Sequence, residues 1–147
     1  MTIADPGTYM KLPSGTKVLW GAVEDLTADL KLLINADSVG SIGKIAGFVE
    51  ATRLIDTEKK FIAEMPEGED KEFIFFDNPA DADLQALVTA ADANQTVKIR
   101  VEFPNGRWAD MIVVLSGWRQ EEPNKGEPLK LAIVGKQNGI TRGYTAP

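Results

Sequence analysis

Few residues of this chain have types and spacings that could support catalysis. Ser41-Ile-Gly-Lys44 has the Ser-x-x-Lys spacing in which a lysine activates a serine nucleophile, but the partner motifs of serine acylases are missing. The same stretch does not match a phosphate-binding loop either, because Ile45 stands where that loop requires Ser or Thr. We therefore interpret this segment as a turn before a strand.

A second candidate is a run of carboxylates, which could bind a hard cation or act in acid–base hydrolysis. Its members are Glu67, Glu69, Asp70 and Glu72. They lack the ligand spacing of an EF-hand loop, and the chain holds 22 acidic residues, so chance pairs are unavoidable. The chain has no histidine and no cysteine, which removes the commonest general base and the commonest zinc ligands. We expect no catalytic residue, no metal and no cofactor.

The net charge of −6 is unevenly distributed along the 147 residues. Residues 50–92 carry twelve acids and four bases, whereas residues 93–147 carry eight bases and five acids. Non-specific DNA binding depends on Lys and Arg neutralising phosphates, so an acidic chain is not expected to hold DNA tightly. The N-terminus lacks the features of a signal peptide, and no apolar run approaches the ~20 residues that span a bilayer. We expect a soluble protein with no membrane partner.

The clearest structural pattern is a predicted β-hairpin over residues 97–118. Alternate residues from Val97 to Phe103 are apolar, and a Pro-Asn-Gly turn follows. The returning strand is apolar on both faces from Met111 to Leu115. One face can join the core of the domain, whereas the other needs a helix, a second sheet or another copy of the chain. This surplus of apolar strand surface indicates that the protein acts by assembling.

The other elements follow from local patterns. A helix over about 79–93 is predicted by Asn78 as cap, by Pro79 at the first position and by one apolar stripe. Residues 24–36 fit a helical stripe and a strand alternation equally well, and we favour the helix. Each tryptophan lies in an apolar strand and is expected in the core. Further strands are predicted at 16–22, 44–54, 72–76 and 128–136.

Three segments lie outside these elements. Residues 1–15 form a predicted N-terminal arm and residues 138–147 a C-terminal arm, on either side of a domain over 16–137. The charged loop over residues 53–71 is much longer than the usual hairpin loop of two to five residues. Loops of this length tend to be functional.

In this order, the elements resemble the major tail tube proteins of long-tailed, non-contractile, siphovirus-type bacteriophages. The similarity runs from about Gly15 to Gly139 and rests on the order and spacing of several modest markers. The markers are Gly15–Trp20, Gly43–Thr52, Phe73–Phe76, the helix at 81–93, Phe103–Gly106, Ser116–Trp118 and Leu129–Gly135, which runs into Gly139–Thr141. Residues 22–42 have no counterpart in the family pattern.

The resemblance implies a mainly β (α+β) fold, a two-sheet β-sandwich or half-barrel flanked by one helix, with extended arms and a long inter-strand loop. It also implies that six copies close into a ring and that rings stack into a tube around the tape measure protein. Double-stranded DNA would later pass through the bore without sequence-specific binding. Tail terminator and baseplate or hub proteins would be further partners, and the protein would reside in the virion after assembly in the host cytoplasm.

By the same resemblance, the long loop and the two arms would join neighbouring copies. The candidate loop contacts are Arg53, Thr57, Lys59, Lys60, Phe61 and Glu64. The candidate arm contacts are Tyr9, Met10, Leu12, Ile140 and Tyr144. A bore of like charge would let DNA slide, and Glu67, Glu69, Asp70 and Glu72 are its candidate acidic lining.

Three alternatives remain open. Another tail ring component, such as a tail terminator or baseplate hub protein, would stop at a single ring. A monomeric β-sandwich binding module would use the tryptophans or the 64–72 loop to bind a ligand. A carboxylate-dependent hydrolase would need a deep cleft that holds an acid of raised pKa.

Overall fold

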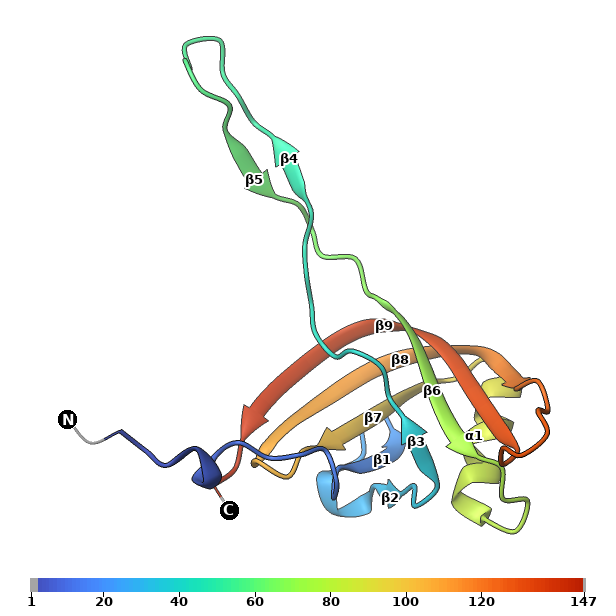
Figure 1. The fold of residues 1–147 in the computed structure, drawn as a ribbon. Coiled ribbons are helices and arrows are strands. Elements are labelled where there is room, and N and C mark those ends of the chain that lie inside the picture. Colours follow the sequence, from blue (N-terminus) through green and yellow to red (C-terminus); the bar gives the residue numbers. More distant parts are fainter. Residues whose placement is uncertain (1–2, 147) are drawn as a thin grey trace.

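The computed structural model describes residues 3–146, which form one curled antiparallel sheet, a helix packed on it and a hairpin that projects away (Figure 1). The seven strands of the sheet lie in the order β2-β1-β7-β8-β9-β6-β3. Their bounds are β1 Lys17–Ala22, β2 Lys31–Leu32, β3 Ala36–Ser38, β6 Asp70–Phe76, β7 Thr96–Glu102, β8 Arg107–Gln120 and β9 Lys130–Tyr144. The remaining elements are the helix α1 Ala82–Asp92, the 3-10 turns η1 Pro6–Thr8 and η2 Thr27–Asp29, and the hairpin strands β4 Phe48–Glu50 and β5 Phe61–Ala63. The predicted fold class, a mainly β half-barrel with one helix, is confirmed.

The β7–β8 hairpin forms where the alternating pattern predicts it. Its register runs from Thr96 opposite Val114 to Glu102 opposite Trp108. The alternate residues of both strands, Val97, Ile99, Val101, Met111, Val113 and Leu115, are buried in the core. On the opposite face of β8, Ile112 is only half-buried. The strand therefore does carry apolar side chains on both faces.

Helix α1 covers the core face of the sheet but begins later than predicted. Asp81 caps it, because its carboxylate accepts a hydrogen bond from the Leu84 amide at 3.4 Å. Asn78, the predicted cap, instead accepts from the Ala80 amide at 3.1 Å in the preceding turn. Asn94 follows the helix with a φ of 54°, the left-handed conformation that commonly ends a helix.

The segment between β2 and β3 connects the two edges of the sheet. These strands are neighbours in sequence, yet they lie at opposite ends of the strand order. The Leu33 amide donates to the Val18 carbonyl at 2.8 Å, and the Phe76 amide donates to the Asn35 carbonyl at 2.8 Å. The prediction of a helix over residues 24–36 is therefore wrong. The only helical part is the short turn η2, because β1 and β6 offer edge partners that an isolated window does not reveal.

Strand β9 also departs from the prediction. We expected a strand that ends near Lys136 and an arm from residue 138, but β9 continues to Tyr144. Its second half pairs with the first half of β8, from Ile140 opposite Met111 to Tyr144 opposite Arg107. This pairing gives hydrogen-bond partners to the backbone N–H and C=O groups on that side of β8. Residues 138–144 therefore belong to the sheet.

Candidate assembly surfaces

Residues 44–67, called the projecting hairpin below, leave the body and extend away from it (Figure 1). Strands β4 and β5 pair from Phe48 opposite Ala63 to Glu50 opposite Phe61. The predicted contact loop, residues 53–71, covers the tip and second strand of this hairpin and continues into β6, where Lys71 is buried. All the predicted loop contacts lie on the projecting hairpin: Arg53, Thr57, Lys59, Lys60, Phe61 and Glu64.

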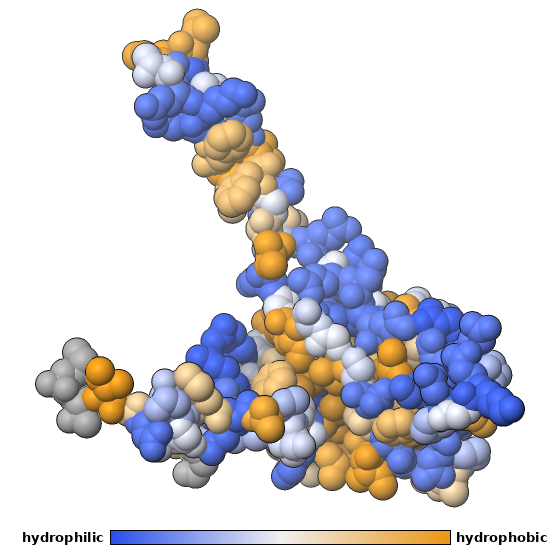
Figure 2. Space-filling view, viewed as in Figure 1, coloured by the Kyte–Doolittle hydropathy of each residue, from blue (hydrophilic) through white to orange (hydrophobic). Residues whose placement is uncertain are grey.

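The projecting hairpin exposes large apolar side chains at its tip and along its stem. Leu54 and Ile55 at the tip are 105% and 82% exposed, and Phe61 on the stem is 58% exposed. Figure 2 shows this apolar surface on both the tip and the stem. An isolated two-stranded hairpin is marginally stable in water, and each large apolar side chain gains about 1.5–3 kcal/mol from full burial. These properties are those of a contact surface.

The turn at the tip is held by one acid–base pair. The Arg53 guanidinium donates to the Asp56 carboxylate at 2.9 Å and 3.2 Å, and the Arg53 amide donates to the same carboxylate at 2.7 Å. The side-chain hydrogen bond from Arg53, followed by its backbone hydrogen bond, lowers the pKa of Asp56. The carboxylate is therefore ionised, and the turn closed, at neutral pH.

Two buried polar side chains hold the base of the projecting hairpin, and we call Lys71 and Gln137 the root pair. Each is only 3% exposed. Lys71 Nζ donates to the Ser41 carbonyl at 2.6 Å and pairs with Glu69 Oε2 at 2.9 Å. Gln137 Nε2 donates to the Gly43 carbonyl at 3.1 Å, and its amide donates to the Glu69 carbonyl at 2.9 Å. The root pair thus contacts both the segment that enters the hairpin and the segment that leaves it.

Beside the root pair, the backbone at Gly68 packs so closely that no larger residue fits. A Cβ atom added to Gly68 would lie in collision with the Gln137 carbonyl oxygen, so only glycine fits there. The Gln137 side-chain oxygen is buried and has no hydrogen-bond partner among the described residues. The root is therefore closely packed, although its contacts are polar.

The candidate lining acids stand beside cations. Glu67 pairs with Lys136 at 2.8 Å, Glu69 pairs with Lys71, and Glu72 pairs with Arg119. A hydrogen bond from Lys136, together with its charge, lowers the pKa of Glu67. This direction is opposite to that required of the general acid in a hydrolase. The pairs also offset much of the negative charge that these acids would present.

The two predicted arms differ in structure. Tyr9, Met10 and Leu12 are exposed on an N-terminal arm that extends from the body (Figure 1). Ile140 is half-buried within β9, and Tyr144 is exposed at the end of that strand. Only the N-terminal segment is an arm along most of its length.

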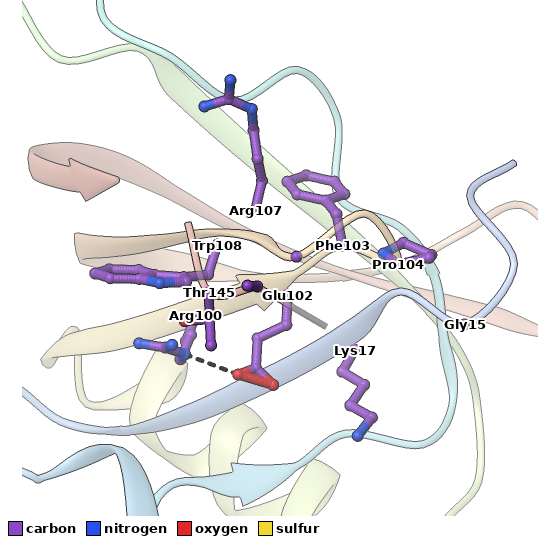
Figure 3. A pocket seen from close by; sticks show the side chains of 11 residues that line it. Gly15, Lys17, Arg100, Glu102, Phe103, Pro104, Arg107, Trp108 and Thr145 are labelled. Atoms are coloured by element: carbon purple, nitrogen blue, oxygen red, sulfur yellow. Dashed lines mark hydrogen bonds and ion pairs between the residues drawn. The ribbon is translucent and has the colours of Figure 1, made fainter. Parts of the chain in front are cut away.

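A cluster of charges that the sequence analysis missed lies on the sheet face opposite the core. Arg100 is buried between two acids: its Nε lies 3.1 Å from Glu102, and its Nη1 lies 3.2 Å from both Asp110 oxygens. Its guanidinium also stacks on the Trp108 ring at 4.3 Å (Figure 3). The cross-strand register brings these residues together, and register is not visible in either strand alone.

The tryptophans do not share one environment, contrary to the prediction that all three lie in the core. Trp20 packs against the core, and its indole donates to the Asp83 carbonyl at 3.2 Å. Trp118 is about half exposed and donates to Asp92 at 2.6 Å. Trp108 stacks on Arg100, so the rings form no common platform for a ligand.

A groove of ≈ 630 Å³ opens beside the β7–β8 turn, and we call it the basic groove. Its apolar and aromatic residues are Ile42, Phe103, Trp108, Ala109 and Ile140, and its cations are Lys44, Arg107 and Arg142. Figure 3, a view of the neighbouring pocket, shows two of the groove residues, Arg107 and Phe103, on the same side of the turn. No acid lines the groove. The sequence analysis missed it because its residues come from three distant segments.

Neither a membrane helix nor a metal cluster occurs in the described residues. No helix between residues 3 and 146 is long and apolar enough to cross a bilayer. The same residues contain no group of three or more acids placed to hold a metal ion.

A curled half-barrel with one helix and a projecting hairpin that exposes apolar side chains is the architecture of a structural subunit suited to assembly. The sequence matches the phage tail tube protein family over residues 11–145, so the chain belongs to this family. The protein is accordingly a structural component of the virion tail. No curated protein matches the chain.

Solved tube proteins share this fold at low sequence identity. The tail of an empty gene transfer agent (GTA) particle matches with a TM-score of 0.66 and 12% identity, covering 93% of this chain and 100% of the other. The SPP1 tail tube matches with a TM-score of 0.64 and 12% identity, covering 90% and 78%. A subunit of the PVC sheath–tube complex, from an extracellular contractile injection system, matches with a TM-score of 0.69 and 7% identity, covering 99% and 100%. The fold therefore occurs in a particle tail, in a tail tube and in the sheath–tube complex of a contractile injection system.

Proposed function

We propose that this chain is the major tail tube subunit of a long-tailed, non-contractile bacteriophage. Six copies close into a ring, and the rings stack into a tube around the tape measure protein. Double-stranded DNA passes through the bore once that protein has left. The tube is assembled in the host cytoplasm and ends on tail terminator and baseplate or hub proteins.

The observation that carries this proposal is the projecting hairpin, which exposes apolar side chains on a rigid root. From Gly47 to Ile55 the extended chain covers about 26 Å at ~3.3 Å per residue. This reach is about twice the ~13 Å radius of gyration of a 100-residue domain. Such a hairpin can reach past its own body to a neighbouring subunit or ring, where its apolar side chains can be buried.

Charge in the bore is a separate part of the proposal. Glu67, Glu69, Asp70 and Glu72 remain its candidate lining, and like charge would let DNA slide without counterion release. Three cations accompany these four acids, so we expect only a small net negative charge from this set. The bore would then be weakly repulsive to DNA.

Removal of the projecting hairpin tests the proposal directly. The Glu64 amide donates to the Gly47 carbonyl at 2.9 Å, so residues 48–63 can be replaced by an Asn-Gly turn that rejoins two adjacent strands. We expect a folded protein that builds no tubes at concentrations where the wild type builds them, as seen by negative-stain microscopy. Glu58→Ala, which keeps the hairpin and its apolar residues and lies outside the candidate contacts, is the matched control and should build tubes.

The outcomes also separate the alternative functions. Tubes formed by the deletion variant would contradict the assembly role of the hairpin. A wild-type protein that stays monomeric at every concentration would favour a binding module, and one that stops at single rings would favour a terminator or hub protein.

A further inference from the structure

We propose that the basic groove of one copy receives an acidic patch of the next copy, so that copies join head to tail. The acidic patch consists of Val23, Glu24, Leu26, Asp29 and Leu32, which surround the turn η2. This inference rests on the proposed function, because it names the contact through which neighbouring subunits meet.

The basic groove has the composition of an interface that lacks its partner. Lys44, Arg107 and Arg142 are exposed, and none of them takes part in an ion pair within residues 3–146. Three neighbouring cations without an acid are unusual in a chain of net charge −6. Between them lie Ile42 and Ile140, both half-buried. The groove therefore suits a partner that is apolar at its centre and acidic around it.

The acidic patch has the complementary composition. Glu24 and Asp29 are exposed and make no ion pair in the part of the chain that the structure describes. Val23, Leu26 and Leu32 are also exposed, which is unfavourable for three aliphatic side chains in one short stretch. Burying them against the groove would remove this cost.

The loop that carries the acidic patch is held in place before any partner binds. Asp25 accepts a hydrogen bond from the Ala22 amide at 2.9 Å, and Lys98 Nζ donates to the Asp25 carbonyl at 2.8 Å. Leu30, just after η2, is buried. Little conformational entropy is then lost when the patch binds.

The two surfaces lie at opposite ends of the strands that carry them. Strands β1 and β7 are antiparallel, with Lys17 opposite Glu102 at one end and Ala22 opposite Val97 at the other. The groove residues Phe103 and Arg107 follow the first end, and the acidic patch follows the second. A chain with complementary surfaces at opposite ends makes heterologous contacts, which close into rings when the rotation permits.

The tip of the projecting hairpin is the rival occupant, and its charge argues against it. Residues 53–60 contain three bases and two acids, so this apolar tip carries a net positive charge. The cations of the groove would repel it, whereas they attract the acidic patch. The patch is therefore the better match.

Paired charge reversals test the contact. Glu24→Lys with Asp29→Lys reverses the patch, and Arg107→Glu with Arg142→Glu reverses the groove, with no described ion pair disturbed. We expect each pair alone to raise the concentration needed for assembly by at least about tenfold, which corresponds to about 1.4 kcal/mol. The fourfold variant has an acidic groove and a basic patch, so the two surfaces attract each other again. The concentration that it needs for assembly should lie within about threefold of the wild-type value, a difference of less than 1 kcal/mol. Sedimentation velocity and negative-stain microscopy give the readout.

A control pair separates the effect of where the charges lie from the effect of the net charge. Glu122→Lys with Glu127→Lys makes the same change in net charge on an exposed loop outside both surfaces. This variant should assemble like the wild type. Loss of assembly by this control to the same degree as in the patch variant would overturn the proposal. The proposal would also be overturned if the fourfold variant failed to assemble although its circular dichroism spectrum and melting temperature were those of the wild type.

Crosslinking supplies a second readout that does not depend on charge. The chain has no cysteine, so Leu26→Cys with Ile42→Cys places two unique thiols, one on each surface. A short bismaleimide should link assembled copies of the double variant into a ladder of oligomers, whereas each single variant should yield no ladder. Assembled tubes that give no ladder would overturn the contact. So would charge reversals that weaken assembly when made in the groove but not when made in the patch. A wild type that never assembles would instead contradict the proposed function.

Discussion

The body and the projecting hairpin use the same apolar residue types in opposite ways. Phe73 in β6 is fully buried, whereas Phe61 in β5 is 58% exposed. The body buries its side chains because its sheet curls around α1 and the segment between β2 and β3 connects its edges. The hairpin has two strands and touches the body only at its root, so it has no second layer to cover it. One part of this protein completes its own fold, and the proposed function assigns the covering of the other part to neighbouring copies.

The contacts between the two parts are themselves different from those within the body. The core is apolar, whereas the root depends on the buried polar side chains of Lys71 and Gln137. Apolar contacts are non-directional, but hydrogen bonds to carbonyl groups require a defined geometry. A polar root is therefore suited to setting the direction of the hairpin.

The largest expected difference comes from one substitution made in each part. Phe73→Ala should lower the free energy of unfolding by about 3–5 kcal/mol, because it leaves a cavity in the core. Phe61→Ala should change the stability of the monomer by less than about 0.5 kcal/mol, yet it should weaken tube formation. Urea denaturation measures the first effect and negative-stain microscopy the second. Equal destabilisation by both substitutions would show that the hairpin packs on its own body.

A pair of glycines sharpens the contrast at the root. Gly68→Ala should cost about 1–3 kcal/mol, because the new methyl group meets the backbone of Gln137. Gly47→Ala is the matched control on the hairpin. There the methyl group meets only the end of the Glu64 side chain, which can move, so the cost should be below about 0.5 kcal/mol. Thermal unfolding of both variants checks the difference.

The root pair can be tested without disturbing the core. Lys71→Met keeps the volume but loses the hydrogen bond to the Ser41 carbonyl, which should cost about 1 kcal/mol. The hairpin should then move more freely, with backbone order parameters of residues 45–66 falling from about 0.85 towards 0.6. Nitrogen-15 relaxation of the monomer measures this. Unchanged order parameters would mean that the root pair does not set the direction of the hairpin.

The smallest expected effect is the response of the hairpin tip to acid. The pKa of Asp56 is lower in the folded state, so its pair with Arg53 stabilises the turn above the ordinary carboxyl pKa of about 3.9. That stabilisation is lost as the pH falls through the lower folded pKa. Chemical shifts of the Arg53 amide should follow this titration, and Asp56→Asn should abolish it. Glu58→Gln, on the same turn, is the control and should leave the titration in place.

Local patterns predicted the elements that depend on near neighbours in sequence. The β7–β8 hairpin follows from alternation around a Pro-Asn-Gly turn, and α1 follows from its apolar stripe, with an error of three residues at its start. Residues 24–36 failed because their strands exist only through partners in β1 and β6. The C-terminal arm failed because its residues pair with the first half of β8.

The candidate site likewise combines features that depend on near neighbours in sequence with features that depend on distant residues. The presence of an unusual connection between the early strands could be predicted, because a long polar stretch stood where a short turn was expected. The extent of the projecting hairpin, residues 44–67, could not be predicted, because the pattern of Lys44 to Glu50 is that of an ordinary strand and only the structure shows that this strand is uncovered. The root pair and the basic groove also escaped notice, because each combines residues from distant segments.

The amino-acid sequence by itself determined a mainly β domain with one helix and more apolar strand surface than one domain can cover. It also determined the lack of histidine and cysteine, because composition and short-range periodicity require no knowledge of contacts. Only the tertiary structure decided which apolar residues remain outside, how the acids pair with cations, and where three cations meet around an apolar groove. Those properties depend on strand register and sheet curvature, which are set by interactions between residues far apart in the chain.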